Sequence, residues 1–132
     1  MKLTIPYYLH KAGAGFPSPA TDYIEEDIDL NVHLIKNVPA TFIIRVQGKS
    51  MVDVGINDGD ILVVDRSIEP KNRDIVIAIL EGNLTVKRLL FKTNGSVVLK
   101  SENTAYKDIK IPESTDLEIW GVVTSAIRQF IK

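Results

Sequence analysis

The sequence predicts a compact, mainly β fold, Greek-key or barrel-like, and three observations lead to that class. From residue 40 onward the chain consists of short runs rich in Val, Ile, Leu and Thr. Turn signals such as Asn-Gly separate these runs, and many short strands at this spacing are typical of all-β domains. The length of 132 residues, with 45% hydrophobic and 25% charged residues, suits one globular domain with a single core.

The elements are predicted in order along the chain. Residues 1–21 are expected to form an extended, irregular arm, because glycines and prolines interrupt a stretch of small residues. The acidic segment from Asp22 suits a helix N-terminus, so one or two short helical turns are expected there. Turns are expected at 57–59, 81–83 and 93–95, between strands at 41–46, 60–65, 74–80, 84–90, 96–100 and 117–127.

Composition argues against several functional classes. The chain has no cysteine and only two histidines, His10 and His33, so disulfides are excluded, and neither a structural zinc site nor another cofactor is expected. No apolar run approaches the roughly 20 residues that span a bilayer, and the N-terminus has no apolar signal region. These features favour a cytoplasmic protein. The net charge of −1, with basic and acidic residues interleaved, argues against tight direct binding of nucleic acid.

Ser50 is the first candidate for chemistry. Gly48-Lys49-Ser50 resembles the end of a phosphate-binding loop, but the glycine required upstream is replaced by Ile43, so nucleotide binding is rejected. Gly48 would let the chain turn sharply and present Ser50 at the end of a strand. Residues 50–53 also fit a helix capping box, and from spacing alone a capping role is the better interpretation. The two roles are compatible, because backbone N–H groups of Ser50 and Met51 at such a turn would stabilise an oxyanion.

A nucleophilic serine needs a base, and Lys87 is the best candidate. His10 lies in the arm and His33 in an amphipathic stretch, so a Ser-His-Asp arrangement is unsupported. Lys87 lies inside a mostly apolar predicted strand, where it and Arg88 point to opposite faces. The ordinary alternative is that both cations reach solvent. To act as a base, Lys87 must be neutral, which requires burial or a nearby positive charge to lower its pKa.

Two motifs carry a resemblance to a known family. The run from Gly48 to Asp65, GKSMVDVGINDGDILVVD, resembles the Ser-Met-x-x-x-Gly-Ile-x-x-Gly-Asp core of the LexA-like self-cleaving peptidases. TVKRL at 85–89 resembles the family's second motif, which carries its lysine, and the spacing between the motifs fits. The resemblance covers residues 15–132. It implies the compact β fold of the family's C-terminal peptidase domain, with Ser50 as nucleophile and Lys87 as general base.

The resemblance also implies a cut site and partners. Residues 15–23 are similar to the segment after the cleavage point in the regulatory subunits of error-prone DNA polymerase V, and only residues 1–14 precede it, too few for a repressor's DNA-binding domain. Cleavage between Ala14 and Gly15 would remove the arm, residues 1–14. The remaining chain would consist of a segment with short helical turns, residues 15–39, and a peptidase and dimerisation domain, residues 40–132. The implied trigger is the RecA–single-stranded-DNA filament. The implied partners are a second copy, the UmuC-like catalytic subunit and the sliding clamp.

Two other interpretations are weighed. A non-catalytic interaction module that binds polymerase or RecA would need neither Ser50 nor Lys87, so the presence of both, with an intact Ala14-Gly15 arm, argues against it. A signal peptidase shares Ser–Lys chemistry, but the membrane anchor of that family is missing from the sequence. Whether the arm is cut in its own chain or across a dimer stays open.

Overall fold

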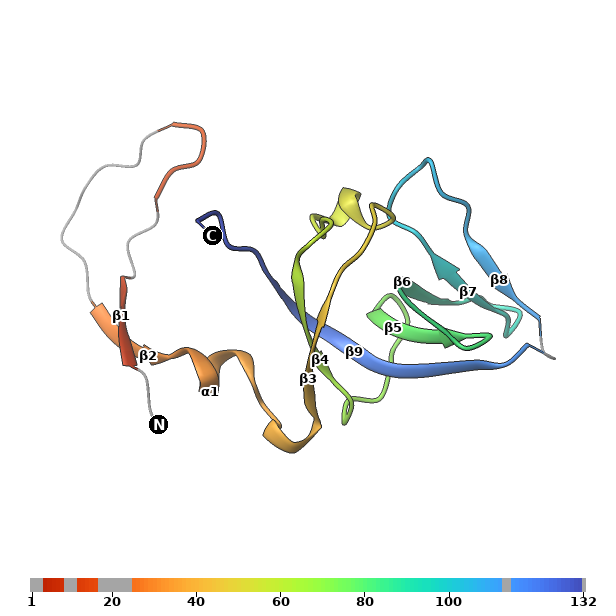
Figure 1. Ribbon diagram of the computed structural model, residues 1–132, viewed down its shortest axis with the longest axis horizontal. Helices are drawn as coiled ribbons and strands as arrows, with labels where there is room; N and C mark the ends of the chain where they lie inside the picture. Colours follow the sequence, from red (N-terminus) through yellow and green to blue (C-terminus); the bar gives the residue numbers. More distant parts are fainter. Residues whose placement is uncertain (1–3, 9–11, 17–24, 113–114, 132) are drawn as a thin grey trace. The chain divides into compact units, whose positions relative to one another are not determined.

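The structure, a computed structural model, describes residues 4–8, 12–16, 25–112 and 115–131, and it divides into the units Met1–Lys36 and Asn37–Lys132. In the smaller unit, strand β1 (Thr4–Tyr8) pairs antiparallel with strand β2 (Glu25–Asp29), and helix α1 (Leu30–Leu34) follows (Figure 1). The unit therefore has a sheet of its own.

The prediction for the N-terminal segment is partly wrong. An irregular arm was expected, yet residues 4–8 form a strand, in which Pro6 lies opposite Asp27. Residues 12–16 form neither helix nor strand, and the arm residues 1–3, 9–11 and 17–21 lie outside the described residues. The expected helical turn is confirmed at 30–34. The acidic residue Asp29 caps it, because its carboxylate accepts a hydrogen bond of 2.9 Å from the Asn31 N–H.

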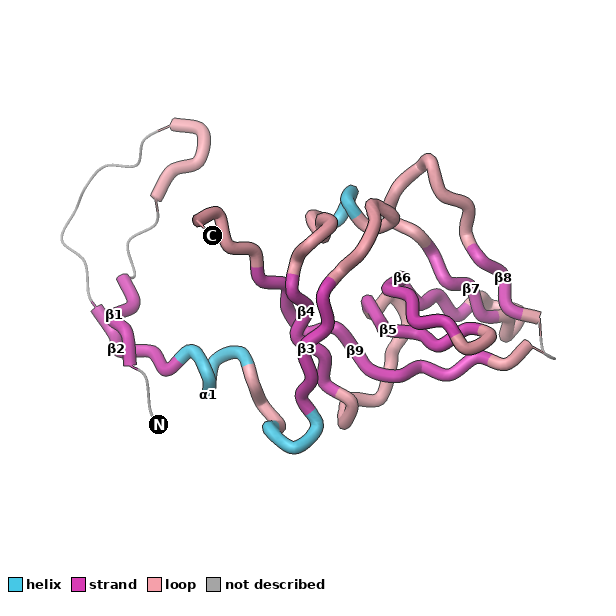
Figure 2. The backbone as a smooth tube through the Cα atoms, viewed as in Figure 1, coloured by secondary structure: helices cyan, strands magenta, loops and turns pink. Residues whose placement is uncertain are grey.

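The larger unit contains a seven-stranded antiparallel sheet, which confirms the predicted fold class. All six predicted strands are present, and the short strand at 109–111 was not predicted. In Figure 2, loops and turns rather than long helices connect these strands. The elements are η1 (Val38–Ala40), β3 (Thr41–Arg45), η2 (Val52–Val54), β4 (Ile61–Asp65), β5 (Ile75–Leu80), β6 (Asn83–Phe91), β7 (Val97–Lys100), β8 (Ile109–Ile111) and β9 (Leu117–Ile127).

Strand β9 holds the sheet together. The strand order is β3-β4-β9-β5-β6-β7-β8, so β9 lies between β4 and β5 and is their only link within the sheet as described (Figure 1). Its register shifts once against β4, between Val63 and Val64, and once against β5, between Ile77 and Ala78. Such bulges increase the local twist and bend the strand. The sheet therefore curls instead of lying flat.

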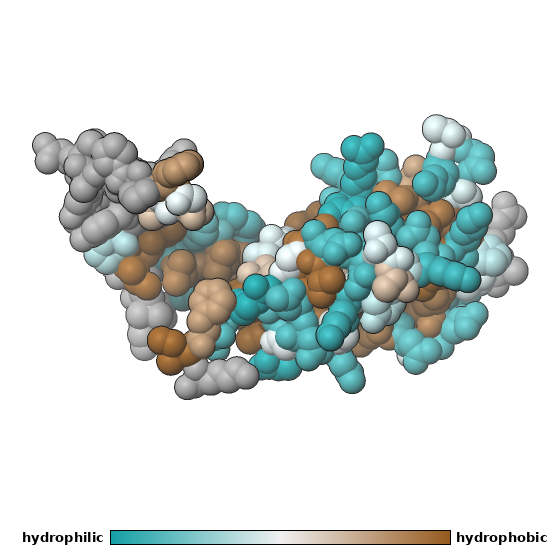
Figure 3. Space-filling model, turned by 90° about the horizontal axis from the view of Figure 1, so that it is seen from above, coloured by the Kyte–Doolittle hydropathy of each residue, from teal (hydrophilic) through white to brown (hydrophobic). Residues whose placement is uncertain are grey.

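Two clusters of buried side chains form the core, one on each face of the central strands. Ile77 belongs to one cluster, whereas its neighbours on β5, Val76 and Ala78, belong to the other. Successive side chains of a strand point to opposite faces, so β5 is buried on both sides. This explains why its sequence is a continuous apolar run. The face of this unit seen in Figure 3 is mostly hydrophilic, with small hydrophobic areas between the polar ones.

Candidate active site

Ser50 lies in a turn between β3 and β4, which we call the Ser50 turn (residues 48–51). Gly48 has φ +98°, in the left-handed region that glycine adopts readily, so the chain reverses sharply after β3 as expected. The Gly48 N–H donates a 2.7 Å hydrogen bond to Oδ1 of Asp58. Met51 is only 1% exposed and belongs to the core. The buried Met51 thus anchors the turn, while Ser50 stays half-buried at the surface.

The helix-capping alternative for Ser50 is not realised. Helix η2 begins after Met51, and no side chain caps it. In a capping box the serine oxygen would accept from the Asp53 N–H. Instead, that N–H donates a 2.8 Å hydrogen bond to the carbonyl of Glu102. The Ser50 hydroxyl is therefore left for another partner.

That partner is Lys87, in the middle of β6. Its side chain points to the face that carries Ser50, and its Nζ donates a 2.9 Å hydrogen bond to the Ser50 Oγ. Lys87 is 7% exposed, and this burial lowers the pKa of its ammonium group, because the charged form loses hydration. The structure thus brings together the two residues that the sequence singled out, and the lysine amine is largely shielded from solvent.

A cleft of about 330 Å³ adjoins Ser50. Strands β3 and β6 and their neighbours form its walls, and most of the side chains are aliphatic. In the described chain, the backbone N–H groups of Ser50 and Met51 donate to no protein acceptor. Besides Ser50, the cleft is lined by Ile44, Arg45, Val46, Gln47, Leu62, Ile77, Leu84, Thr85 and Val86.

The remaining candidate residues belong to the smaller unit. Ala14 and Gly15 are both exposed and lie in the segment 12–16, outside helices and strands. His33 is exposed in the last turn of α1, and His10 lies outside the described residues.

Sequence reasoning missed two ion pairs, one next to Lys87 on β6 and one at the buried Asp60. The Nε of Arg88 pairs with the Glu102 carboxylate at 2.7 Å, and its Nη1 donates to the Arg73 carbonyl. Arg128 makes a two-pronged ion pair with Asp60, which is 3% exposed. The hydrogen bond from Arg128 lowers the pKa of Asp60. These contacts join distant parts of the chain, so no local pattern reveals them.

A serine hydroxyl in contact with a buried lysine amine is the arrangement used by Ser–Lys hydrolases. The sequence matches the Peptidase S24-like family over residues 6–124. The chain therefore belongs to that family.

Individual relatives cover most of the chain. Protein SamA of Salmonella typhimurium is 44% identical over 126 residues, which are 96% of this chain and 86% of SamA. Protein ImpA of Shigella flexneri is 43% identical over 124 residues, which are 94% of this chain and 83% of ImpA. The LexA repressor of Clostridium perfringens is 36% identical over 120 residues, which are 91% of this chain but 57% of the repressor. Among the described residues, no helix is long and apolar enough to cross a membrane.

Proposed function

We propose that the chain is a self-cleaving serine peptidase in which Ser50 is the nucleophile and Lys87 the general base. The observation that carries this proposal is the 2.9 Å contact between the Ser50 Oγ and the Nζ of the buried Lys87. Neutral lysine is a base, and the lowered pKa of Lys87 increases its neutral fraction at a given pH. The family membership supports the same chemistry.

The proposed reaction cuts the peptide bond between Ala14 and Gly15. Lys87 takes the proton of Ser50 as Oγ attacks the Ala14 carbonyl carbon, and the N–H groups of Ser50 and Met51 stabilise the oxyanion. The C–N bond then breaks, and Lys87 delivers the proton to the leaving amine of Gly15. Water, deprotonated by Lys87, hydrolyses the acyl-enzyme and restores Ser50. The released products are the peptide 1–14 and the processed chain 15–132.

The cut site and the cleft suit each other. Ala14 and Gly15 are exposed and have small side chains, so the backbone of this segment can approach the Ser50 Oγ closely. The 330 Å³ cleft is lined by both aliphatic and polar side chains, so it offers apolar surface and hydrogen-bonding groups to the residues around the cut. No cofactor takes part in this scheme.

The biological role that we propose is UmuD-like. After DNA damage, the RecA–single-stranded-DNA filament would stimulate the cut in the cytoplasm, as part of the SOS response. The processed chain, as a homodimer, would join a UmuC-like catalytic subunit in error-prone translesion DNA polymerase V, with the sliding clamp as a further partner. This role rests on the resemblance of residues 15–23 to polymerase V regulatory subunits and on the similarity to SamA and ImpA over most of the chain.

Mass spectrometry of the intact protein tests the cut. Incubation with RecA, ATP and single-stranded DNA, or at alkaline pH without activator, should convert the full chain to a product that begins at Gly15. Ser50→Ala should stay intact under both conditions. Ala14→Trp should block the cut without unfolding the larger unit. A parent chain that keeps its full mass, or that is cut elsewhere, would contradict the proposal and favour a non-catalytic interaction module.

Light scattering tests the assembly. The described edge strands of the large sheet, β3 and β8, each have one unpaired side, and pairing with a second copy is a common way to cover such an edge. A homodimer is therefore expected both before and after cleavage. A monomer at micromolar concentration would contradict it.

A further inference from the structure

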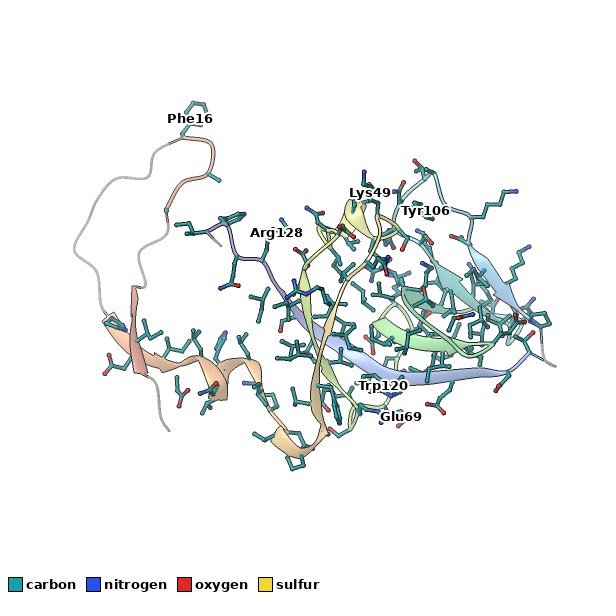
Figure 4. All side chains as sticks on the ribbon, in the orientation of Figure 1. Phe16, Lys49, Glu69, Tyr106, Trp120 and Arg128 are labelled. Carbon is teal, nitrogen blue, oxygen red and sulfur yellow. The ribbon has the colours of Figure 1, made fainter. Side chains whose placement is uncertain are left out.

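The segment that follows β7 lies against the Ser50 turn. Residues 101–103 pass beside it, and Figure 4 shows Lys49 close to the loop that continues to Tyr106. The Nδ2 of Asn103 donates a 2.8 Å hydrogen bond to the Lys49 carbonyl, one residue before Ser50. Glu102 makes further contacts with Met51 and Asp53, after Ser50. This segment, which we call the brace (residues 101–103), therefore holds the turn on both sides of the serine.

Both ends of the Asn103 amide are engaged. Its Oδ1 accepts a 3.0 Å hydrogen bond from the Ala105 N–H while its Nδ2 donates to Lys49. The amide cannot rotate without losing one of these bonds. The Lys49 carbonyl is thus held at a defined place.

Glu102 connects the turn to the strand that carries the lysine. Its backbone carbonyl accepts from the Asp53 N–H at 2.8 Å, and its own N–H lies 3.4 Å from the Met51 sulfur. Its carboxylate pairs at 2.7 Å with the Nε of Arg88, the neighbour of Lys87 on β6. Both members of this pair are mostly buried, with side chains 17% and 26% exposed. One short segment therefore ties the Ser50 turn to the backbone next to Lys87.

We propose that Asn103 and Glu102 are positioning residues that hold the Ser50 Oγ at hydrogen-bond distance from the Lys87 Nζ. The proposal rests on the function proposed above and names the residues that preorganise it. Ser50 lies in the turn after β3 and Lys87 lies on β6, so a shift of the turn relative to β6 changes their separation directly. A misplacement of about 1 Å can cost about a hundredfold in rate.

The chain offers a matched control for Asn103. Asn94, in the turn between β6 and β7, also accepts a 3.0 Å hydrogen bond from an N–H two residues ahead, that of Ser96. Asn94→Ala therefore removes a similar local turn bond at a distance from the Ser50 turn. Asn103→Asp complements Asn103→Ala, because aspartate keeps an acceptor for Ala105 but replaces the donor to Lys49 with a negatively charged oxygen.

Two rates test the proposal: self-cleavage at alkaline pH without activator, and covalent labelling of Ser50 by a fluorophosphonate probe, which does not depend on the arm. Asn103→Ala and Asn103→Asp should slow both by about tenfold to a hundredfold. Glu102→Gln should slow both in the same direction. For Asn103→Ala, the midpoint of the pH profile should not move, because Lys87 stays buried. Asn94→Ala should match the parent.

The outcomes separate this inference from the proposed function. If the parent cleaves itself and the folded Asn103 variants cleave and label at parental rates, the positioning role is overturned and the peptidase function stands. If the rates fall only in proportion to the unfolded fraction seen in thermal melts, the brace is merely structural and the inference is also overturned. If the parent does not cleave itself but its Ser50 is labelled faster than in the folded Asn103 variants, the peptidase function fails and the positioning role stands.

Discussion

Lys87→Arg is the sharpest test of the chemistry. Arginine keeps the positive charge and much of the reach, but its guanidinium does not deprotonate in a protein, so it cannot serve as a base. In the structure the lysine amine is the group that contacts the Ser50 Oγ, at 2.9 Å, and Lys87 is only 7% exposed. Loss of the base in serine peptidases costs about 10⁴- to 10⁶-fold in rate. That loss corresponds to about 5–8 kcal/mol of transition-state stabilisation.

The assay is the time course of product mass at several pH values without activator. The parent rate should rise from neutral to alkaline pH, because burial lowers the pKa of Lys87 and only the neutral amine is active. Ser50→Ala and Lys87→Ala should each abolish cleavage, and the double variant should be no worse, because the two residues act as a unit. Lys110→Arg is the control, since Lys110 is an exposed strand lysine on β8. A folded Lys87→Arg protein, verified by circular dichroism, that cleaves at a comparable rate would refute the proposed base.

Three further predictions concern stability. Gly121→Ala should lower the free energy of unfolding by about 1–3 kcal/mol in denaturant titrations, because a Cβ there would lie 2.5 Å from the Cγ1 of the fully buried Val64; an unchanged midpoint would contradict this. Arg128→Gln should lower the melting temperature at pH 7. The difference in melting temperature between this variant and the parent should vanish as acid protonates Asp60. The lowered pKa of Asp60 means that the ion pair stabilises the fold only while the carboxylate is ionised. Lys87→Met should raise the stability at neutral pH, since burial disfavours the charged amine. The gain should shrink toward pH 10.5, the ordinary lysine pKa, and a loss of stability at neutral pH would argue against this account.

The sequence predicted the large sheet well because its signals there are local. Runs of β-branched residues and Gly-containing turns specify β4 to β7 and β9 without reference to distant contacts. The strand at 109–111 was not predicted, because three residues are too few to show a recognisable alternation of apolar and polar side chains. The strands β1 and β2 were not predicted for another reason. The acidic residues at 25–29 suggest the start of a helix, but their pairing with residues 4–8 outweighs that local preference.

In the candidate site, too, local sequence patterns identified some residues, whereas contacts between distant residues had to come from the structure. Residue patterns indicated Ser50 as a nucleophile only weakly, and the family resemblance rather than the spacing connected it with Lys87. The structure adds the contact between them. The roles of Arg88, Glu102 and Asn103 were out of reach of sequence patterns, because each depends on contacts with residues far away in the chain.

The place of β9 in the sheet also bears on the protein's synthesis. Ser50 follows β3 and Lys87 lies on β6, while β9, which joins the β3-β4 half to the β5-β6 half, is the last described strand to leave the ribosome. A nascent chain that ends before β9 contains both residues but lacks the strand that holds the two halves side by side. In such a chain the brace still connects the Ser50 turn to β6, but no sheet pairing joins the two halves. Under the proposed function, the active geometry would form fully only once β9 has joined the sheet, so residues 1–14 would still be attached when the larger unit folds.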